Sequence, residues 1–167
     1  GPNIRLPLMA APPIFFMPFS IEAEVEVPEG GGDGVIVAAG SQFGGWSFYL
    51  DDGKPVAFAS VSPLIPARHQ SRVAADKPVS PGNHTLRFNF EPAGQGGTLT
   101  ISADGTQVAS GAIRTRPKML AGNGETFDTG RDTNVAVSPD YRREGVFNGL
   151  INRVEILINI PARPGAH

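Results

Sequence analysis

The sequence predicts an all-β domain that folds as a two-sheet antiparallel sandwich of jelly-roll type. Apolar and polar residues alternate with period two in several short runs, and long helical periodicity is missing. The 21 glycines and 16 prolines are abundant between these runs, where they mark turns. About ten short strands separated by turn signals are typical of two sheets packed face to face.

Size and composition limit the function classes. The 167 residues, 40% of them hydrophobic, suffice for one domain with a packed core. With 14 basic and 16 acidic residues the net charge is −2, and no basic stripe is visible, so neither nucleic acid nor an anionic membrane is an expected partner. No apolar run approaches the ~18 residues that span a membrane. The absence of cysteine excludes disulfides and leaves the compartment open, whether cytoplasmic, periplasmic or secreted.

Four strands are predicted in the first half of the chain, over residues 20–27, 34–40, 46–50 and 55–60. In the first, every second residue from Ile21 to Val27 is apolar and the residues between them are glutamates, so one face should be buried and the other exposed. The second is apolar on both faces, as a central strand would be. An Asp-Gly pair at residues 52–53 predicts a tight hairpin between the last two strands.

Further strands are predicted within residues 68–75, 77–90, 98–110, 111–116 and 149–160, with residues 91–97 as a flexible hairpin loop. The apolar residues expected to face inward in these stretches are Leu86, Phe88, Phe90, Leu99, Ile101, Val154, Ile156, Ile158 and Ile160. A second Asp-Gly pair, at residues 104–105, predicts another tight turn. Phe88 and Ile156 are expected to anchor the core, so truncating either to alanine should cost ~3 kcal/mol or more.

Residues 1–19 are predicted to form an apolar N-terminal arm, ahead of a sandwich domain over residues 20–160 and a disordered tail over residues 161–167. The arm contains five prolines, which rules out a central strand or a helix. It either lies over the sandwich or packs against another domain or a second copy of the chain, because exposed apolar segments of this size usually have a partner. The interface residues would be Phe15, Phe16, Met17 and Phe19.

The residue types that catalysis requires do not occur in recognisable patterns. His69, His84 and His167 lack a metal-binding spacing, and no Gly-x-Ser-x-Gly elbow is present. The glycine clusters are hairpin tips that open no helix, which argues against a phosphate cradle. We therefore predict that this chain is not an enzyme and needs no cofactor for chemistry.

Two binding functions remain open on the residues alone. Asp128, Asp132 and Asp140 lie in one irregular loop, where their hard oxygen ligands suit a structural Ca²⁺. The alternative is that these aspartates stabilise turns through their side chains, since the EF-hand spacing is missing. A carbohydrate or sulfated ligand would be bound by Tyr49, Tyr141, Arg68 and Arg72. Tyr49 is expected to be exposed because it points away from Trp46, which shares the core face of its strand.

Several ordered stretches resemble the C-terminal domain of a large group of bacterial arylsulfatases. In that family a Pro-Glu-Gly-Gly turn leads into a Gly-Val-Ile strand, a Phe-Gly-Gly-Trp-Ser segment and an Asp-Gly-Lys-Pro hairpin, and matching letters stand at residues 28–31, 34–36, 43–47 and 52–55. Residues 81–91, 96–116, 125–141 and 147–158 are similar to its later strands and closing loop. The resemblance covers residues 20–158.

The resemblance implies a concanavalin-like sandwich that follows a sulfatase catalytic domain, packs on it and supports it. That catalytic domain makes its formylglycine in a Cys-x-Pro-x-Arg motif, whereas this chain has no cysteine, so no catalytic residue carries over. The apolar residues 12–19 depart from the polar segment of the family, which favours a packed arm. The expected partner is a sulfatase catalytic domain. The alternatives are a carbohydrate- or sulfated-ligand-binding module, and a homo-oligomer joined through the arm.

Overall fold

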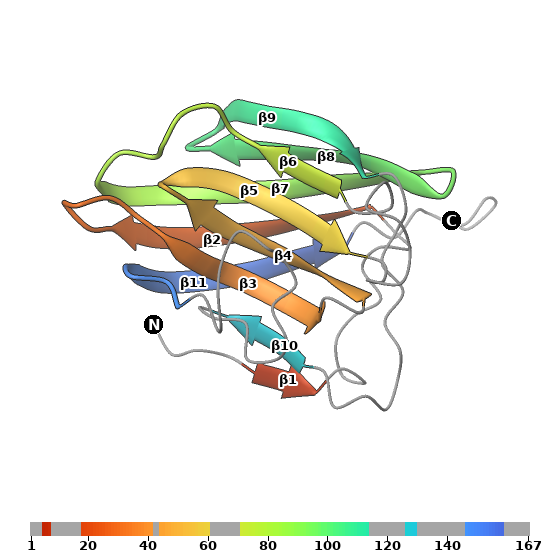
Figure 1. The fold of residues 1–167 in the computed structure, drawn as a ribbon, viewed down its shortest axis with the longest axis horizontal. Helices are drawn as coiled ribbons and strands as arrows, with labels where there is room; N and C mark the ends of the chain where they lie inside the picture. Colours follow the sequence, from red (N-terminus) through yellow and green to blue (C-terminus); the bar gives the residue numbers. More distant parts are fainter. Residues whose placement is uncertain are drawn as a thin grey trace, which may run out of the picture.

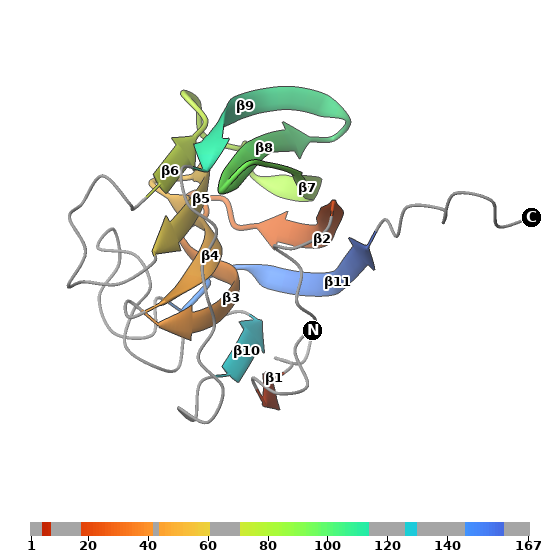
Figure 2. The same ribbon diagram turned by 90° about the vertical axis from the view of Figure 1, so that its right-hand side faces the viewer.

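The computed structural model describes residues 5–7, 18–41, 44–60, 71–113, 126–129 and 146–158. These residues form eleven strands and no helix. No helix in the described part of the chain could therefore cross a membrane. The strands make two antiparallel sheets that face each other, which confirms the predicted two-sheet sandwich (Figures 1 and 2).

The six-stranded sheet, called sheet A, has the order β1 (Arg5–Pro7), β10 (Thr126–Thr129), β3 (Gly34–Ser41), β4 (Gly44–Asp51), β5 (Lys54–Ser60) and β6 (Ser71–Ala74). The five-stranded sheet, called sheet B, has the order β11 (Leu150–Ile158), β2 (Phe19–Val27), β7 (Gly82–Ala93), β8 (Gly96–Ala103) and β9 (Thr106–Ile113). Strands distant in sequence are neighbours in both sheets, as β2 and β7 show.

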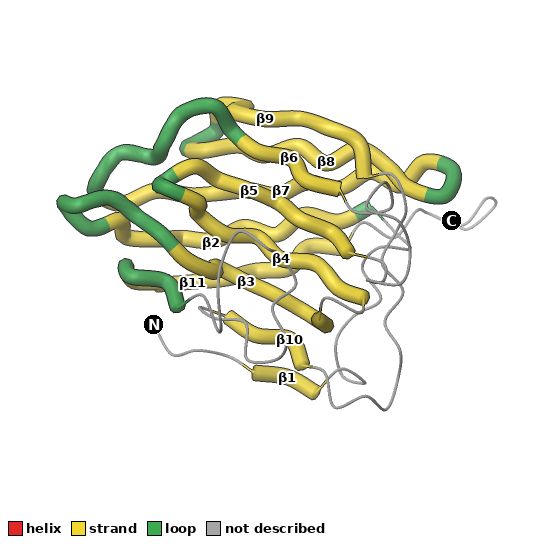
Figure 3. Tube along the Cα trace, in the orientation of Figure 1, coloured by secondary structure: helices red, strands yellow, loops and turns green. Residues whose placement is uncertain are grey.

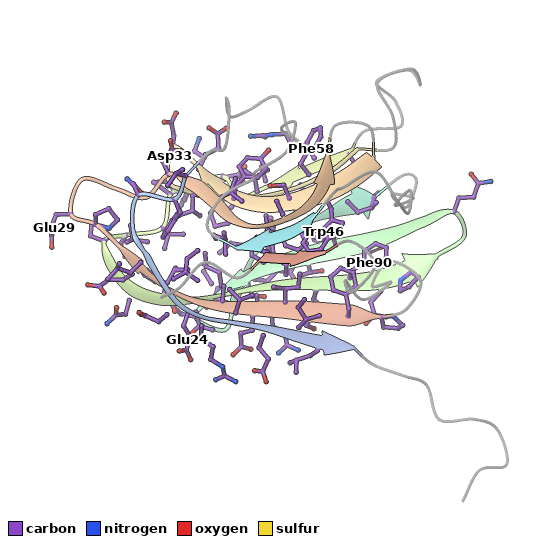
Figure 4. The ribbon with its side chains drawn as sticks, turned by 90° about the horizontal axis from the view of Figure 1, so that it is seen from below. Glu24, Glu29, Asp33, Trp46, Phe58 and Phe90 are labelled. Atoms are coloured by element: carbon purple, nitrogen blue, oxygen red, sulfur yellow. The ribbon has the colours of Figure 1, made fainter. Side chains whose placement is uncertain are left out.

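The core lies between the sheets and follows the predicted alternation. Ile21, Val25 and their apolar neighbours on β2 are buried, and the glutamates between them lie on the outer side. Phe48 of sheet A stacks on Phe88 of sheet B, with ring centroids 4.3 Å apart and an interplanar angle of 10°. Figure 4 shows Trp46 and Phe90 between the sheets and Glu24 outside them. The predicted core position of Trp46 is confirmed.

A second apolar cluster covers the other face of sheet A. It consists of Val35, Ala38, Tyr49, Val56 and Phe58. The prediction that β3 is apolar and buried on both faces is therefore confirmed. The expected exposure of Tyr49 is wrong, because only 1% of this residue is exposed.

Several strand boundaries differ from the sequence prediction. Residues 91–97 are mostly strand, since β7 and β8 continue to a turn at Gly94 and Gln95. Residues 111–113 continue β9 and do not start a new strand, because the ladder with β8 runs on to Ile113. Ile156 is half-buried, since β11 is the edge strand of sheet B, so it is a weaker core anchor than predicted.

The predicted N-terminal arm is described only in part. Arg5–Pro7 forms an edge strand that pairs with β10, a position where proline is tolerated. Phe19 starts β2 and is 1% exposed, with its ring centroid 5.5 Å from that of Phe90. Phe19 thus belongs to the core, which corrects its assignment to an interface. Phe15, Phe16, Met17 and the tail over residues 161–167 lie outside the described residues.

Candidate ligand-binding site

Most of the described loops gather at one end of the sandwich, on the left in Figure 3. The loop between β2 and β3 is tied there to the residues that precede β11. The Asn148 side chain accepts a hydrogen bond from the Asp33 backbone N–H (2.8 Å) and donates one to the Gly31 carbonyl (3.0 Å). A single amide side chain therefore joins segments more than a hundred residues apart in sequence and fixes this end of the molecule.

Both Asp-Gly pairs form the predicted tight turns at this end. Asp52 and Gly53 have φ of 48° and 78°, and Asp104 and Gly105 have φ of 51° and 83°. Positive φ at both central residues is the geometry whose twist matches that of the flanking strands. The second turn, between β8 and β9, places the Asp104 side chain beside β7.

His84, near the start of β7, lies between Asp104 and Ser80. Its Nδ1 is 2.5 Å from Asp104 Oδ2, and its Nε2 is 2.7 Å from the Ser80 carbonyl oxygen and 3.3 Å from the Ser80 hydroxyl. The other Asp104 oxygen accepts a hydrogen bond from the Thr85 backbone N–H at 2.8 Å. The His84 side chain is 13% exposed and that of Asp104 is 52% exposed. The three residues join the loop before β7 to the turn after β8.

Serine, histidine and aspartate in a row resemble a nucleophile, base and orienting acid, but the hydrogen bonds do not suit that chemistry. A general base needs an unprotonated nitrogen that faces the serine hydroxyl. Here Nε2 lies closer to the Ser80 carbonyl oxygen than to the Ser80 hydroxyl, so it is not directed at the hydroxyl as a base would be. The contacts of this cluster therefore hold the loop before β7 and the turn after β8 together.

The stability of the folded chain is expected to depend on whether the Asp104 carboxylate is protonated. The backbone N–H of Thr85, followed by the His84 side chain, holds the pKa of Asp104 below its usual value of 3.8. A pKa lowered in the folded state means that the carboxylate stabilises the fold above its unfolded pKa, and that this stabilisation is lost as the pH falls below it. Asp104→Asn should therefore flatten the decline in melting temperature below about pH 4.

The control for this prediction is Asp52→Asn, since Asp52 occupies the equivalent position of the other Asp-Gly turn. Asparagine tolerates the positive φ of both turns, so neither variant should disturb the backbone. Melting curves recorded between about pH 2 and pH 6 compare the two variants with the unaltered chain. If the melting temperature fell with pH in the same way for all three proteins, the role assigned to Asp104 would be contradicted.

A polar hollow of about 310 Å³ opens beside the His84–Asp104 pair, where β7 begins. We call it the polar hollow; its lining residues are Glu24, Val25, Asn83, His84, Thr85, Asp104 and Asn152. A β-bulge in β11 contributes to it. The ladder between β11 and β2 slips after Ile151, so Asn152 has no ladder partner of its own and both Asn152 and Arg153 lie on the outer side. Amide, carboxylate, hydroxyl and imidazole groups therefore converge on one small space.

Of the site residues predicted from the sequence, the two that the structure describes, Tyr49 and Arg72, do not line this hollow. Tyr49 is buried on sheet A, and Arg72 of β6 pairs with Asp51 at 3.0 Å. Arg68 and Tyr141 lie outside the described residues, so a site built from all four residues stays a prediction.

The predicted calcium site also remains open. The described residues contain no cluster of three acidic, histidine or cysteine side chains that could hold a metal. Asp128 lies on β10 opposite Ala38, and Asp132 and Asp140 are outside the described part.

The sequence reasoning missed the polar hollow, although two signals pointed to it. His84 precedes a clear strand pattern, and Asp104 belongs to an Asp-Gly turn. Pairing β7 with the strand before that turn would have placed the two side by side, since Leu86 lies opposite Ala103. The bulge at Asn152 left no trace in the sequence pattern.

Several solved structures share this fold. Domains LG4-5 of the mouse laminin alpha1 chain match with a TM-score of 0.64 and 12% identity over 92% of this chain, which spans 38% of the laminin chain. CBM40 of the Ruminococcus gnavus IT-sialidase matches with a TM-score of 0.61 and 11% identity, over 97% of this chain and 89% of that one. Sheep galectin-11 has a TM-score of 0.51 and 9% identity, over 94% and 98% of the two chains.

At these identities the likeness establishes the fold: the chain is a jelly-roll β-sandwich of concanavalin-like type. No protein-family model and no curated protein matches the sequence. The arylsulfatase resemblance therefore gains support only for its fold.

Proposed function

We propose that this chain is a non-catalytic binding module that takes a carbohydrate in the polar hollow. The observation that carries the proposal is the convergence of planar and hydroxyl side chains on a space of about 310 Å³, which falls within the size range of small-ligand sites. Asn83 and Asn152 enter it from β7 and β11, and Glu24 enters it from β2.

Sugar hydroxyls donate and accept hydrogen bonds at the same time, so they need both kinds of partner close together. Amide side chains offer donors and acceptors, carboxylates accept, and the Thr85 hydroxyl can do either. A site built to hydrogen-bond hydroxyl groups discriminates strongly against ligands that lack them. The lining of the polar hollow matches this requirement better than it matches an apolar molecule.

The structural relatives support the same proposal. The CBM40 of the R. gnavus IT-sialidase was solved bound to alpha2,3 sialyllactose, a carbohydrate, with a TM-score of 0.60 to this chain. At an identity of 10% this likeness concerns the fold alone, so the proposal depends on the residues of the polar hollow and not on those of that protein.

A glycan array probed with the purified chain tests the proposal. Binding to one or more glycans is expected. Asn152→Ala and Asn83→Ala should each weaken it about fivefold, since a lost hydrogen bond costs about 1 kcal/mol. Gln95→Ala removes an exposed amide at the other end of β7 and should leave binding unchanged. No binding at high protein concentration, or equal losses in all three variants, would contradict the proposal.

A second candidate function is that of a C-terminal accessory domain of an arylsulfatase, which the ordered motifs favour. The sandwich fold is compatible with it, although the laminin, CBM40 and galectin-11 structures are not sulfatases. A Cys-x-Pro-x-Arg segment in the same natural polypeptide would support this candidate. The two candidates are compatible, because a sandwich packed on a catalytic domain by one face can bind a glycan with another.

A further inference from the structure

A second hollow of about 350 Å³ lies beside the polar hollow and shares His84 and Asp104 with it. We call it the apolar hollow; its apolar lining consists of Pro55, Pro78, Val79, Ala103 and Val108, and Asp76, Lys77 and Ser80 line it as well. Val108 is 37% exposed, so a ligand in this hollow could contact its side chain. Two hollows of different polarity thus meet at one hydrogen-bonded pair of side chains.

The wall of the apolar hollow is held in place by backbone contacts. The Val79 N–H donates to the Gly53 carbonyl at 2.8 Å, and the Ala75 N–H donates to the Pro55 carbonyl at 2.9 Å. Gly53 approaches the loop so closely that a Cβ atom there would lie 2.8 Å from Pro78 Cβ. The loop over residues 75–81 is therefore fixed against the turn between β4 and β5, and the hollow is preformed. Preformed walls reduce the entropic cost of binding a ligand.

His84 and Asp104 separate the two hollows and belong to both. His84 holds the loop through Ser80 and the β8–β9 turn through Asp104, so its ring is fixed on both sides. The half-exposed Asp104 side chain lines both hollows, so a ligand that occupied both would contact it. Such a ligand must be polar at one end and apolar at the other.

The charges around the polar hollow determine which sugars fit. Glu24 and Asp104 both line it, and an anionic sugar would place a further negative charge beside two carboxylates. The Arg153 guanidinium pairs with Glu155 and lies 3.8 Å from Glu24. A neutral sugar avoids this repulsion and still finds acceptors for its hydroxyl groups.

We propose that the two hollows form one bipartite site for a neutral glycoside, with the sugar ring in the polar hollow and an apolar aglycone in the apolar hollow. This inference rests on the proposed carbohydrate-binding function and specifies its ligand class. The aglycone is an aromatic or alkyl group of a size that the apolar hollow holds. The two carboxylates of the polar hollow disfavour a sulfated or carboxylated sugar ring there.

Calorimetric titration of paired glycosides tests the inference. The probes are the methyl and phenyl glycosides of glucose, galactose, mannose and N-acetylglucosamine, in both anomers, together with phenyl glucuronide. For the sugar that binds, the phenyl glycoside should bind about tenfold more tightly than the methyl glycoside, because it buries an additional ring. Phenyl glucuronide should bind at least about tenfold more weakly than phenyl glucoside.

Val108→Asp should abolish the preference for the phenyl glycoside over the methyl glycoside. Val146→Asp is the control, since Val146 is an exposed valine that does not line the apolar hollow.

If methyl and phenyl glycosides bind equally, or Val108→Asp keeps the preference, the bipartite site is overturned while the carbohydrate function stands. Equal binding of phenyl glucuronide overturns the neutral ligand class. If none of the glycosides binds and the glycan array is also negative, the proposed function itself fails.

Discussion

Replacing Phe88 with alanine is expected to lower the free energy of unfolding by about 3–5 kcal/mol. Phe88 is fully buried on β7, and its ring stacks on Phe48 of the opposite sheet. The substitution removes the ring from the centre of the interface between the sheets and leaves a cavity that the neighbouring strands cannot fill without breaking their ladders. Because β7 pairs with β2 on one side and with β8 on the other, relaxation of the backbone is restricted.

Urea unfolding followed by tryptophan fluorescence measures this loss. Trp46 is the single tryptophan, it is buried, and its ring centroid lies 5.0 Å from that of Phe48. The comparison variant is Ile156→Ala, which should cost only about 1–2 kcal/mol because Ile156 is half-buried on an edge strand. If Phe88→Ala lowered the free energy of unfolding by less than about 1 kcal/mol, this packing of the two sheets would be contradicted. The same would follow if Ile156→Ala lowered it by more than Phe88→Ala does.

The fold class could be predicted because the information for it is local. Period-two alternation assigns the faces of β2 and β7 without reference to any other strand, and an Asp-Gly pair sets the turn geometry by itself. The burial of Ile21, Leu86 and Phe90 follows from these local rules.

The candidate site could not be predicted in this way because it depends on contacts between distant residues. His84 and Asp104 are twenty residues apart, and the pairing of β7 with β8 brings them together. Asn152 enters the polar hollow through a bulge, which shifts the alternation of β11 at a point where the sequence shows no glycine or proline. The wrong prediction for Tyr49 has a related reason. Alternation says which residues share a face, but not that the outer face of sheet A also carries an apolar cluster.

Gly34→Ala is expected to destabilise the fold by about 2–4 kcal/mol, for reasons of backbone geometry. Gly34 begins β3 with a φ of +108°, a conformation that side chains with a Cβ rarely adopt. A Cβ atom there would overlap the Val146 carbonyl oxygen and lie 2.7 Å from Phe147 Cα, both backbone atoms. The substitution would therefore push the segment before β11 away from β3 and break the bridge between Val35 and Val146.

Gly30→Ala in the same loop is the matched control. Gly30 does not have positive φ, and no heavy atom lies within 4 Å of the position of its added Cβ. Alanine there should be neutral or stabilising by up to about 1 kcal/mol, since it reduces the entropy of the unfolded chain. Urea unfolding of both variants measures the difference. Equal stabilities would mean that the segment over residues 146–149 does not pack against β3 as closely as the structure shows, and Asn148 could then not hold the loops at this end of the sandwich.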